Sequence, residues 1–190
     1  DKFYTDKLAS YASKLDTNAG FCGDRSNLNL QSGVGIGTVI TYNKGYLRVE
    51  ESTPTLTCEN ASDYYTVASA SSGNKKLSYP IGLITADEVM LAGHAGGVFD
   101  GTPNHQKSNN GSYLVTGNHF WTMTPAGGYN TFGGTGWFAF VFLVVASGGI
   151  DDYNVDHSDG VRDGVRPVVN LKSDVTITGS GTKTNPYVVA

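Results

Sequence analysis

Charged side chains are scarce in this sequence. Asp, Glu, Lys and Arg make up 16% of its 190 residues, against about a quarter in a typical globular protein. The formal net charge is -4 and no run of Lys and Arg occurs, so the basic surface that nucleic-acid binding requires is missing. These absences exclude nucleic acid as the main partner.

Long apolar runs are also missing. The most apolar stretch, Trp137 to Ala146, spans about ten residues, about half of what a membrane-spanning helix needs. It is rich in aromatic residues, which favours a strand, and we expect no membrane span in this chain. The sequence opens with Asp1, which leaves two interpretations: an export segment has been removed, or an anchor or further segment preceded this piece.

Cysteine is nearly absent. Cys22 and Cys58 are the whole complement, and their separation is not the C-x-x-C spacing of a redox or zinc site. In a chain with 25 glycines and 11 tyrosines the pair favours a disulfide, with two separate buried thiols as the alternative. A disulfide implies an oxidising compartment, so we expect the protein to be extracellular or on the cell surface.

The spacings that identify catalytic and metal sites do not occur. His94, His105, His119 and His157 form no HxH, HxxxH or HExxH pattern, so we expect them in solvated loops rather than on a metal. No GxSxG nucleophile elbow is present. The sequence therefore predicts no metal, no cofactor and no catalysis.

Two segments show helical patterns and several later ones show strand patterns. Apolar residues recur at helical spacing in Lys2–Leu15, and Thr85 begins a capping box with Glu88 three residues on. Helices followed by a run of strands predict an α+β fold rather than alternating βαβ units. A long polar loop is expected at Gly96–Gly111, and the strands are expected at Thr38–Tyr42, Phe120–Thr124, Phe138–Val145, Val165–Leu171 and Asp174–Thr178.

A family resemblance rests on motifs in the second half of the chain and around the two cysteines. They are Tyr79–Glu88, Phe120–Pro125, Gly164–Leu171 and Gly181–Val188, with Phe21–Arg25 and Leu56–Cys58 upstream. Together they resemble a bacterial surface and pilin-associated family whose C-terminal part adopts the formylglycine-generating-enzyme-like version of the C-type lectin fold. The resemblance implies a single C-type-lectin-like domain over 1–190, with two helices, short antiparallel strands and long loops. It places a helix and a disulfide-linked segment in 1–60 and the lectin-like core in 77–190.

The same family includes variable proteins diversified by retroelements, in which a reverse transcriptase mutates adenines, mostly in asparagine codons. Such codons cannot become Lys, Glu, Gln, Met or Trp, and none of these five occurs in residues 138–159. The resemblance therefore implies a variable region at about 129–159. Relatives that oxidise cysteine use paired cysteines near the C-terminal end, and no Cys follows Cys58. The candidate ligand-binding residues are Tyr129, Asn130, Phe132, Phe138, Phe140, Leu143, Val145, Asp151, Asp152, Tyr153, Asn154, Asp156, His157 and Asp159.

The acidic segment Asp151–Asp159 admits several interpretations. It is rich in oxygen ligands, but the central Gly and terminal Glu of an EF-hand loop are not at the required offsets. A weak surface calcium site, a solvated acidic turn and a recognition surface stay as alternatives. Aromatics beside Asp, Asn, Ser and Tyr are the mixture that antibody paratopes use. The predicted function is thus an extracellular display domain that binds a protein or surface glycan, with a fixed pilin-like or adhesin subunit as the alternative.

Overall fold

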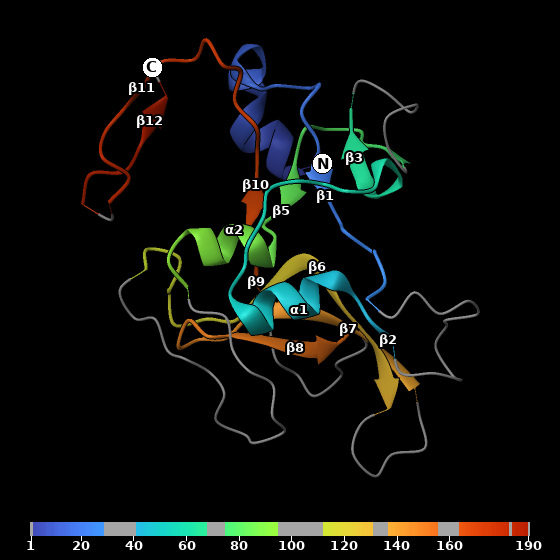
Figure 1. The fold of residues 1–190 in the computed structure, drawn as a ribbon. Helices are drawn as coiled ribbons and strands as arrows, with labels where there is room; N and C mark the ends of the chain where they lie inside the picture. The colour runs from blue at the N-terminus through green and yellow to red at the C-terminus, as the bar shows by residue number, and fades with distance from the viewer. Residues whose placement is uncertain are drawn as a thin grey trace.

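The fold is α+β, as predicted, with a few helices and mostly antiparallel strands arranged in several small sheets (Figure 1). The computed structural model describes residues 2–28, 41–67, 75–94, 112–130, 137–155, 164–182 and 184–189. None of the helices in these ranges is long and apolar enough to cross a membrane. The predicted loop at Gly96–Gly111 and residues 38–40 of a predicted strand lie outside them. The largest sheet has the order β2 (Thr41–Tyr42), β6 (Phe120–Asn130), β7 (Trp137–Val144) and β8 (Ile150–Asn154), with β9 (Gly164–Val165) also pairing with β6.

Strands β6 and β7 form the antiparallel hairpin at the centre of this sheet. Phe120 pairs with Val144 at one end, and the register shifts on both sides of Pro125. A proline has no N–H to donate, so a bulge is where a strand interior tolerates it. Next to the bulge, a Cβ on Gly127 would lie 2.2 Å from the Thr41 carbonyl oxygen. Glycine at this position therefore allows β2 to approach β6.

Helices α1 (Lys44–Glu51) and α2 (Ala86–Leu91) pack on one face of the main sheet (Figure 1). Helix α2 was expected from the sequence, whereas α1 was not. The strands contribute their inward side chains by alternation, and each helix contributes a short apolar face. The resulting core comprises Val49, Ile84, Ala86, Val89, Met90, Leu114, Phe120, Ala126, Phe140, Phe142, Val144 and Ile150.

The capping box predicted at the start of α2 is confirmed. The Glu88 backbone N–H donates to Thr85 Oγ1 at 3.0 Å, and the Thr85 backbone N–H donates to Glu88 Oε2 at 2.7 Å. The first N–H of the helix also has a partner, because Ala86 N–H donates to Thr124 Oγ1 on β6 at 2.9 Å. Helix α2 is thus anchored on the sheet at its N-terminus.

Replacing Thr85 by alanine is expected to lower the free energy of unfolding by about 1 kcal/mol, because it removes the acceptor for an otherwise unpaired helix N–H. Thr85→Ser keeps the hydroxyl and is the matched control. Urea unfolding of both variants measures the difference. Equal losses for the two would mean that the cap contributes through the methyl group and not through its hydrogen bond.

The segment Gly164–Val168 connects two sheets. Strand β9 pairs in parallel with β6, and β10 (Pro167–Val168) pairs antiparallel with β5 (Gly82–Leu83). Between them, the Arg166 guanidinium lies 5.0 Å from the Phe120 ring centroid and donates to Thr116 Oγ1 at 2.6 Å. The strand predicted at Val165–Leu171 is therefore two short strands, and Arg166 helps to hold them on the main sheet.

A third sheet contains the first cysteine. It consists of β1 (Phe21–Cys22), β3 (Tyr64–Thr66) and β4 (Lys75–Lys76), with a 3-10 turn at Ala61–Asp63 before β3. The disulfide between Cys22 and Cys58 is present, with a sulfur–sulfur distance of 2.04 Å. The bond links Cys58, in the segment between α1 and the 3-10 turn, to Cys22 of β1. The disulfide expected from the composition is thus confirmed.

The segment Lys2–Leu15, predicted to be one amphipathic α-helix, is helical but not a regular α-helix. The segment forms a π-helical stretch, Tyr4–Leu8, and a 3-10 stretch, Ala9–Lys14, neither of which has a buried residue. Leu15, just beyond them, is buried, and Tyr4 stacks on Tyr79 with ring centroids 4.6 Å apart. With so little apolar surface packed against the body, a regular helix gains little from this face.

The C-terminal strands stand apart from the rest of the molecule in Figure 1. Strands β11 (Ile177–Thr178) and β12 (Val188–Val189) pair only with each other among the described strands. Ile177 is 48% exposed and Tyr187 is 62% exposed. The predicted strand at Asp174–Thr178 is thus confirmed at its end, in a hairpin that buries little apolar surface.

His94 is a buried residue and not the solvated loop residue that the sequence predicted. It is 3% exposed, and its Nδ1 lies 2.6 Å from the Gly148 carbonyl oxygen in the β7–β8 turn. Because a carbonyl only accepts, Nδ1 carries the proton. The ring therefore ties the end of α2 to this turn. His105 and His157 lie outside the described residues.

Candidate functional site

Strand alternation divides the predicted ligand-binding residues between two faces of the main sheet. In the β7–β8 register Phe140 is opposite Asn154 and Phe142 is opposite Asp152. Because cross-strand partners point to the same face, these side chains share the face covered by the helices. Asp151 and Tyr153 alternate to the opposite face. The predicted residues therefore do not form one continuous surface.

Three predicted contact residues lie in the protein interior. Phe140 is 7% exposed, Leu143 is 1% exposed and Val145 is 4% exposed. Phe140 belongs to the core that the helices cover, and Leu143 and Val145 are buried as well, so none of the three side chains faces solvent. These three side chains are therefore not accessible to a partner in this structure. Phe138 is partly buried and packs at the margin of the core.

The acidic segment begins as a strand and not as a turn. Ile150–Asn154 is β8, paired along its length with β7. Adjacent strand residues point to opposite faces, so Asp151 and Asp152 cannot chelate one ion in the manner of a calcium loop. Within the described ranges, no three His, Cys, Asp or Glu side chains are grouped so as to hold a metal.

The remaining predicted residues lie at the ends of these strands or beyond them. Tyr129 and Asn130 end β6, with backbone positions opposite Phe138 and Trp137. Phe132, Asp156, His157 and Asp159 lie outside the described residues.

Two tyrosines that the sequence analysis did not select form an aromatic pair where α1 packs on the main sheet. Tyr42 of β2 and Tyr46 of α1 have ring centroids 4.5 Å apart, and the Tyr46 ring is 6.3 Å from that of Phe142. Phe142 lies on β7 and is the register partner of Asp152 on β8, so Tyr46 lies over β7, whereas Tyr42 belongs to β2 at the opposite edge of the sheet from β8. Both tyrosines are half-buried. A rigid aromatic pair thus lies next to predicted ligand-binding residues.

Burial and neighbouring groups act on the Tyr46 hydroxyl. Its pKa is raised, first by burial and then by the neighbouring Tyr42, Asp152 and Glu50. Glu50 lies one helical turn after Tyr46 on α1, so the two share a face. We call this set the tyrosine–carboxylate strip: Tyr42, Tyr46, Glu50, Asp152 and Asn154.

Asp152 is the unusual group in the strip. Burial raises the pKa of its carboxyl to about 6. The two cations of α1 form ion pairs with other carboxylates: Lys44 with Glu59, and Arg48 with Asp24 and Asp87. In the part of the chain that the structure describes, no ion pair reaches Asp152. Among the described residues, Asp152 is therefore a partly desolvated carboxylate without an ion-pair partner.

This environment predicts a pH-dependent gain of stability for Asp152→Asn. A folded-state pKa near 6 lies above the unfolded value, so the wild type loses stability as the pH rises from about 4 through 6 and beyond. The variant lacks that loss and should gain about 2 kcal/mol over the wild type at pH 8 relative to pH 4. Urea unfolding at both pH values measures it. Asp151→Asn, on the opposite face of β8, is the control, and the same pH dependence in both variants would contradict the assignment.

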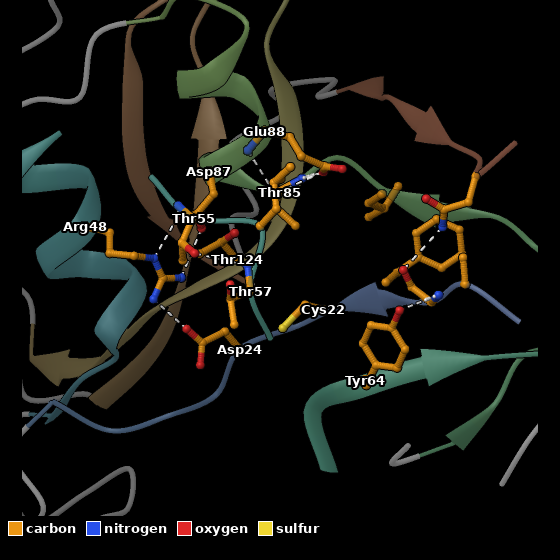
Figure 2. Close-up of a pocket in the computed structure, with 16 residues that line it drawn as sticks. Cys22, Asp24, Arg48, Thr55, Thr57, Tyr64, Thr85, Asp87, Glu88 and Thr124 are labelled. Atoms are coloured by element: carbon orange, nitrogen blue, oxygen red, sulfur yellow. Dashed lines mark hydrogen bonds and ion pairs between the residues drawn. The ribbon is translucent and has the colours of Figure 1, made fainter. Parts of the chain in front are cut away.

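A cavity of about 250 Å³ lies beside the disulfide, away from the strip (Figure 2). The N-terminus of α2 and the Arg48 side chain line one side, and Tyr64 lies on the other. Arg48 Nε and Nη2 donate to the Asp87 carboxylate at 2.7 and 3.0 Å, and Nη1 donates to Asp24 Oδ2 at 2.7 Å. The Thr55 N–H donates to the same Asp87 carboxylate at 3.0 Å.

The charged groups of this cavity satisfy one another. Burial alone would raise the pKa of Asp24, but hydrogen bonds from Ser26 and Arg48 and the Arg48 charge lower it. Glu88 is engaged by the capping box. The cavity is therefore the place where α1, α2 and the disulfide-linked segment are joined, and its polar groups serve that joint. The strip is the better candidate for a binding site.

One sequence signal could have revealed the strip. Tyr46 and Glu50 are spaced four residues apart, which is helical spacing, and Asn43 occupies the N-cap position of α1. The glycine at position 45 and the short length obscured the helix. Their proximity to Asp152 comes from packing between distant segments, which no local pattern shows.

Comparison of the chain with protein-family models, with curated proteins and with solved structures found no match.

Proposed function

We propose that the protein is an extracellular ligand-binding domain that uses the tyrosine–carboxylate strip as its recognition surface and performs no catalysis. The observation that carries the proposal is Asp152, a partly desolvated carboxylate whose charge acts on Tyr46 and which has no ion-pair partner among the described residues. Such a group lowers stability, and proteins retain destabilising groups chiefly where function requires them.

The chemistry of the strip supports recognition. Tyrosine rings give large contact area at small entropic cost, and short polar residues such as Asn and Asp give adaptable hydrogen bonds. The disulfide supports an oxidising, extracellular location. The motifs Gly164–Leu171 and Tyr79–Glu88 support a C-type-lectin-like scaffold of the retroelement-diversified kind, with a protein or surface glycan as partner.

Sequencing of the locus in sister cells tests the diversification. Within codons 129–159, we expect substitutions at adenine positions of exposed or half-exposed residues, such as Asp152 and Asn154. The buried positions Phe140, Phe142 and Leu143 should stay apolar, since about 2–5 kcal/mol is lost when such a side chain is truncated. An invariant locus without a neighbouring template would contradict diversification, and substitutions spread evenly over buried and exposed codons would contradict the surface assignment.

A fixed pilin-like or adhesin subunit is the second candidate, favoured by the C-terminal hairpin. Ile177, Tyr187 and Val188 are exposed on β11–β12, and a lone two-stranded hairpin is marginally stable in water. Contact with a neighbouring subunit would bury these side chains. Deletion of residues 174–190 distinguishes the candidates: it would abolish assembly of a subunit and leave ligand binding by the strip intact.

A further inference from the structure

An apolar groove of about 630 Å³ is formed where the N-terminal segment meets strands β5, β9 and β10. None of the described residues that line it is Asp, Glu, Lys, Arg or His. Val165 is 60% exposed and Phe3 is 46% exposed, so the groove is open to solvent. Its volume is within the roughly 300–1,000 Å³ of sites that enclose a ligand. Its main apolar residues are Phe3, Leu77, Tyr79, Ile81, Val165 and Pro167.

The C-terminal hairpin, β11 with β12, carries an exposed apolar face. Ile177 is the register partner of Val189, and cross-strand partners point to the same face. Tyr187 lies two residues before Val189 and shares that face by alternation. Ile177 is 48% exposed and Tyr187 is 62% exposed. Neighbouring apolar side chains exposed in this way mark a surface that contacts another molecule.

Hydrogen bonds hold the turn of this hairpin. The Ser180 N–H donates to the Asn185 carbonyl oxygen at 3.1 Å, and Asn185 Nδ2 donates to Ser180 Oγ at 3.1 Å. Gly181 has a φ of +72°, and a Cβ there would lie 2.6 Å from the Tyr187 ring. The ring therefore packs closely on the backbone of the turn, although most of it is exposed. Because the hairpin is preformed, its binding costs little in ordering.

The hairpin is held apart from the groove of its own chain. Just before it, the Lys172 N–H donates to the Lys14 carbonyl oxygen at 3.0 Å, and Leu171 forms a β-bridge with Leu15. These contacts fix the start of the hairpin on the N-terminal segment, and Figure 1 shows the hairpin projecting from the molecule. None of its described residues lines the groove. One chain thus presents a projecting apolar element and, at a different place, an open apolar groove.

We propose, resting on the subunit role given above as the second candidate function, that the C-terminal hairpin of one copy of this chain docks in the apolar groove of the next copy. The face with Ile177 and Tyr187 enters the groove and packs on Val165 and Phe3, so the burial of apolar surface supplies the attraction. The two surfaces lie at different places on one chain, so the contact is head-to-tail and each added copy presents a further groove or hairpin. A contact of this size is at the weak end of protein interfaces, with an expected dissociation constant on the order of 100 μM.

Sedimentation velocity from about 10 μM to about 1 mM, a range that brackets the expected constant, tests the contact. The average mass of the wild type should rise with concentration and pass that of a dimer. Ile177→Glu and Val165→Glu should each weaken association at least about tenfold, because each places a charge in an apolar contact. The matched controls should associate as the wild type does. They are Thr178→Glu, on the opposite face of β11, and Leu91→Glu, which is 54% exposed on α2.

A mixture of the two variants identifies the geometry. Val165→Glu keeps an intact hairpin and Ile177→Glu keeps an intact groove, so an equimolar mixture should form dimers that do not grow further. Contact between two hairpins would instead let Val165→Glu associate as the wild type does, and mixing would rescue nothing. That result would overturn the inference, as would a wild type that stays monomeric over the whole concentration range.

The groove and the subunit role fail in different ways. If deletion of residues 174–190 abolishes association while Val165→Glu and Phe3→Glu leave it unchanged, the groove is refuted and the subunit role stands. If the deletion leaves association unchanged, both are refuted. Urea unfolding of each variant at the wild-type midpoint shows that lost association is not lost folding. Phe3→Glu replaces Val165→Glu in the mixture if the latter unfolds early.

Discussion

Replacing Arg48 by alanine is expected to lower the free energy of unfolding by about 3–5 kcal/mol, because it leaves two buried carboxylates without their cation. Arg48 holds Asp87 through two hydrogen bonds and Asp24 through one. Asp87 is 4% exposed and Asp24 is 8% exposed, so both carboxylates are poorly solvated. The side chain also joins α1 to α2 and to the segment after β1. Loss of Arg48 should therefore loosen all three at once.

Urea unfolding measures the loss, with Lys44→Ala on the same helix as the control. Lys44 pairs with Glu59 at the surface, where both side chains are more than a third exposed, so that variant should lose less than about 1 kcal/mol. The combined replacement Arg48→Met, Asp24→Asn and Asp87→Asn removes every charge and should recover much of the stability. A loss for Arg48→Ala no larger than that for Lys44→Ala would refute the role assigned to the triad.

Removal of the disulfide by Cys22→Ser with Cys58→Ser is expected to cost about 3–4 kcal/mol. The bond joins residues 36 apart, and closing a loop of that length restricts the unfolded chain by about this amount. Thermal unfolding with and without reductant measures the effect: reductant should destabilise the wild type and leave the double variant unchanged. The same midpoint for oxidised wild type and double variant would contradict a stabilising disulfide.

Features encoded by neighbouring residues could be predicted from the sequence. The capping box at Thr85 and the strands at Phe120 and Phe138 follow from spacing and from β-branched and aromatic residues, and all three are present. The Cys22–Cys58 bond followed from there being no other cysteine. The α+β class followed from the order of the elements.

Features that depend on packing between distant segments could not be predicted. Phe140 and Leu143 match a ligand-binding mixture in composition, but packing on the faces of the sheet buries both side chains. The run of Asp residues after Ile150 resembles a solvated turn, but pairing with β7 makes it a strand. The Arg48 triad joins positions 24, 48 and 87, a separation at which sequence patterns carry no information.

The most direct test of the account is the titration of the Asp152 carboxyl in the free protein, followed by the chemical shift of its carboxyl carbon from pH 3 to 9. The account predicts half-titration near pH 6, caused by burial. An ordinary value near 4 in the free protein would mean that Asp152 is solvated or already paired, and would contradict its assignment as the centre of the binding site.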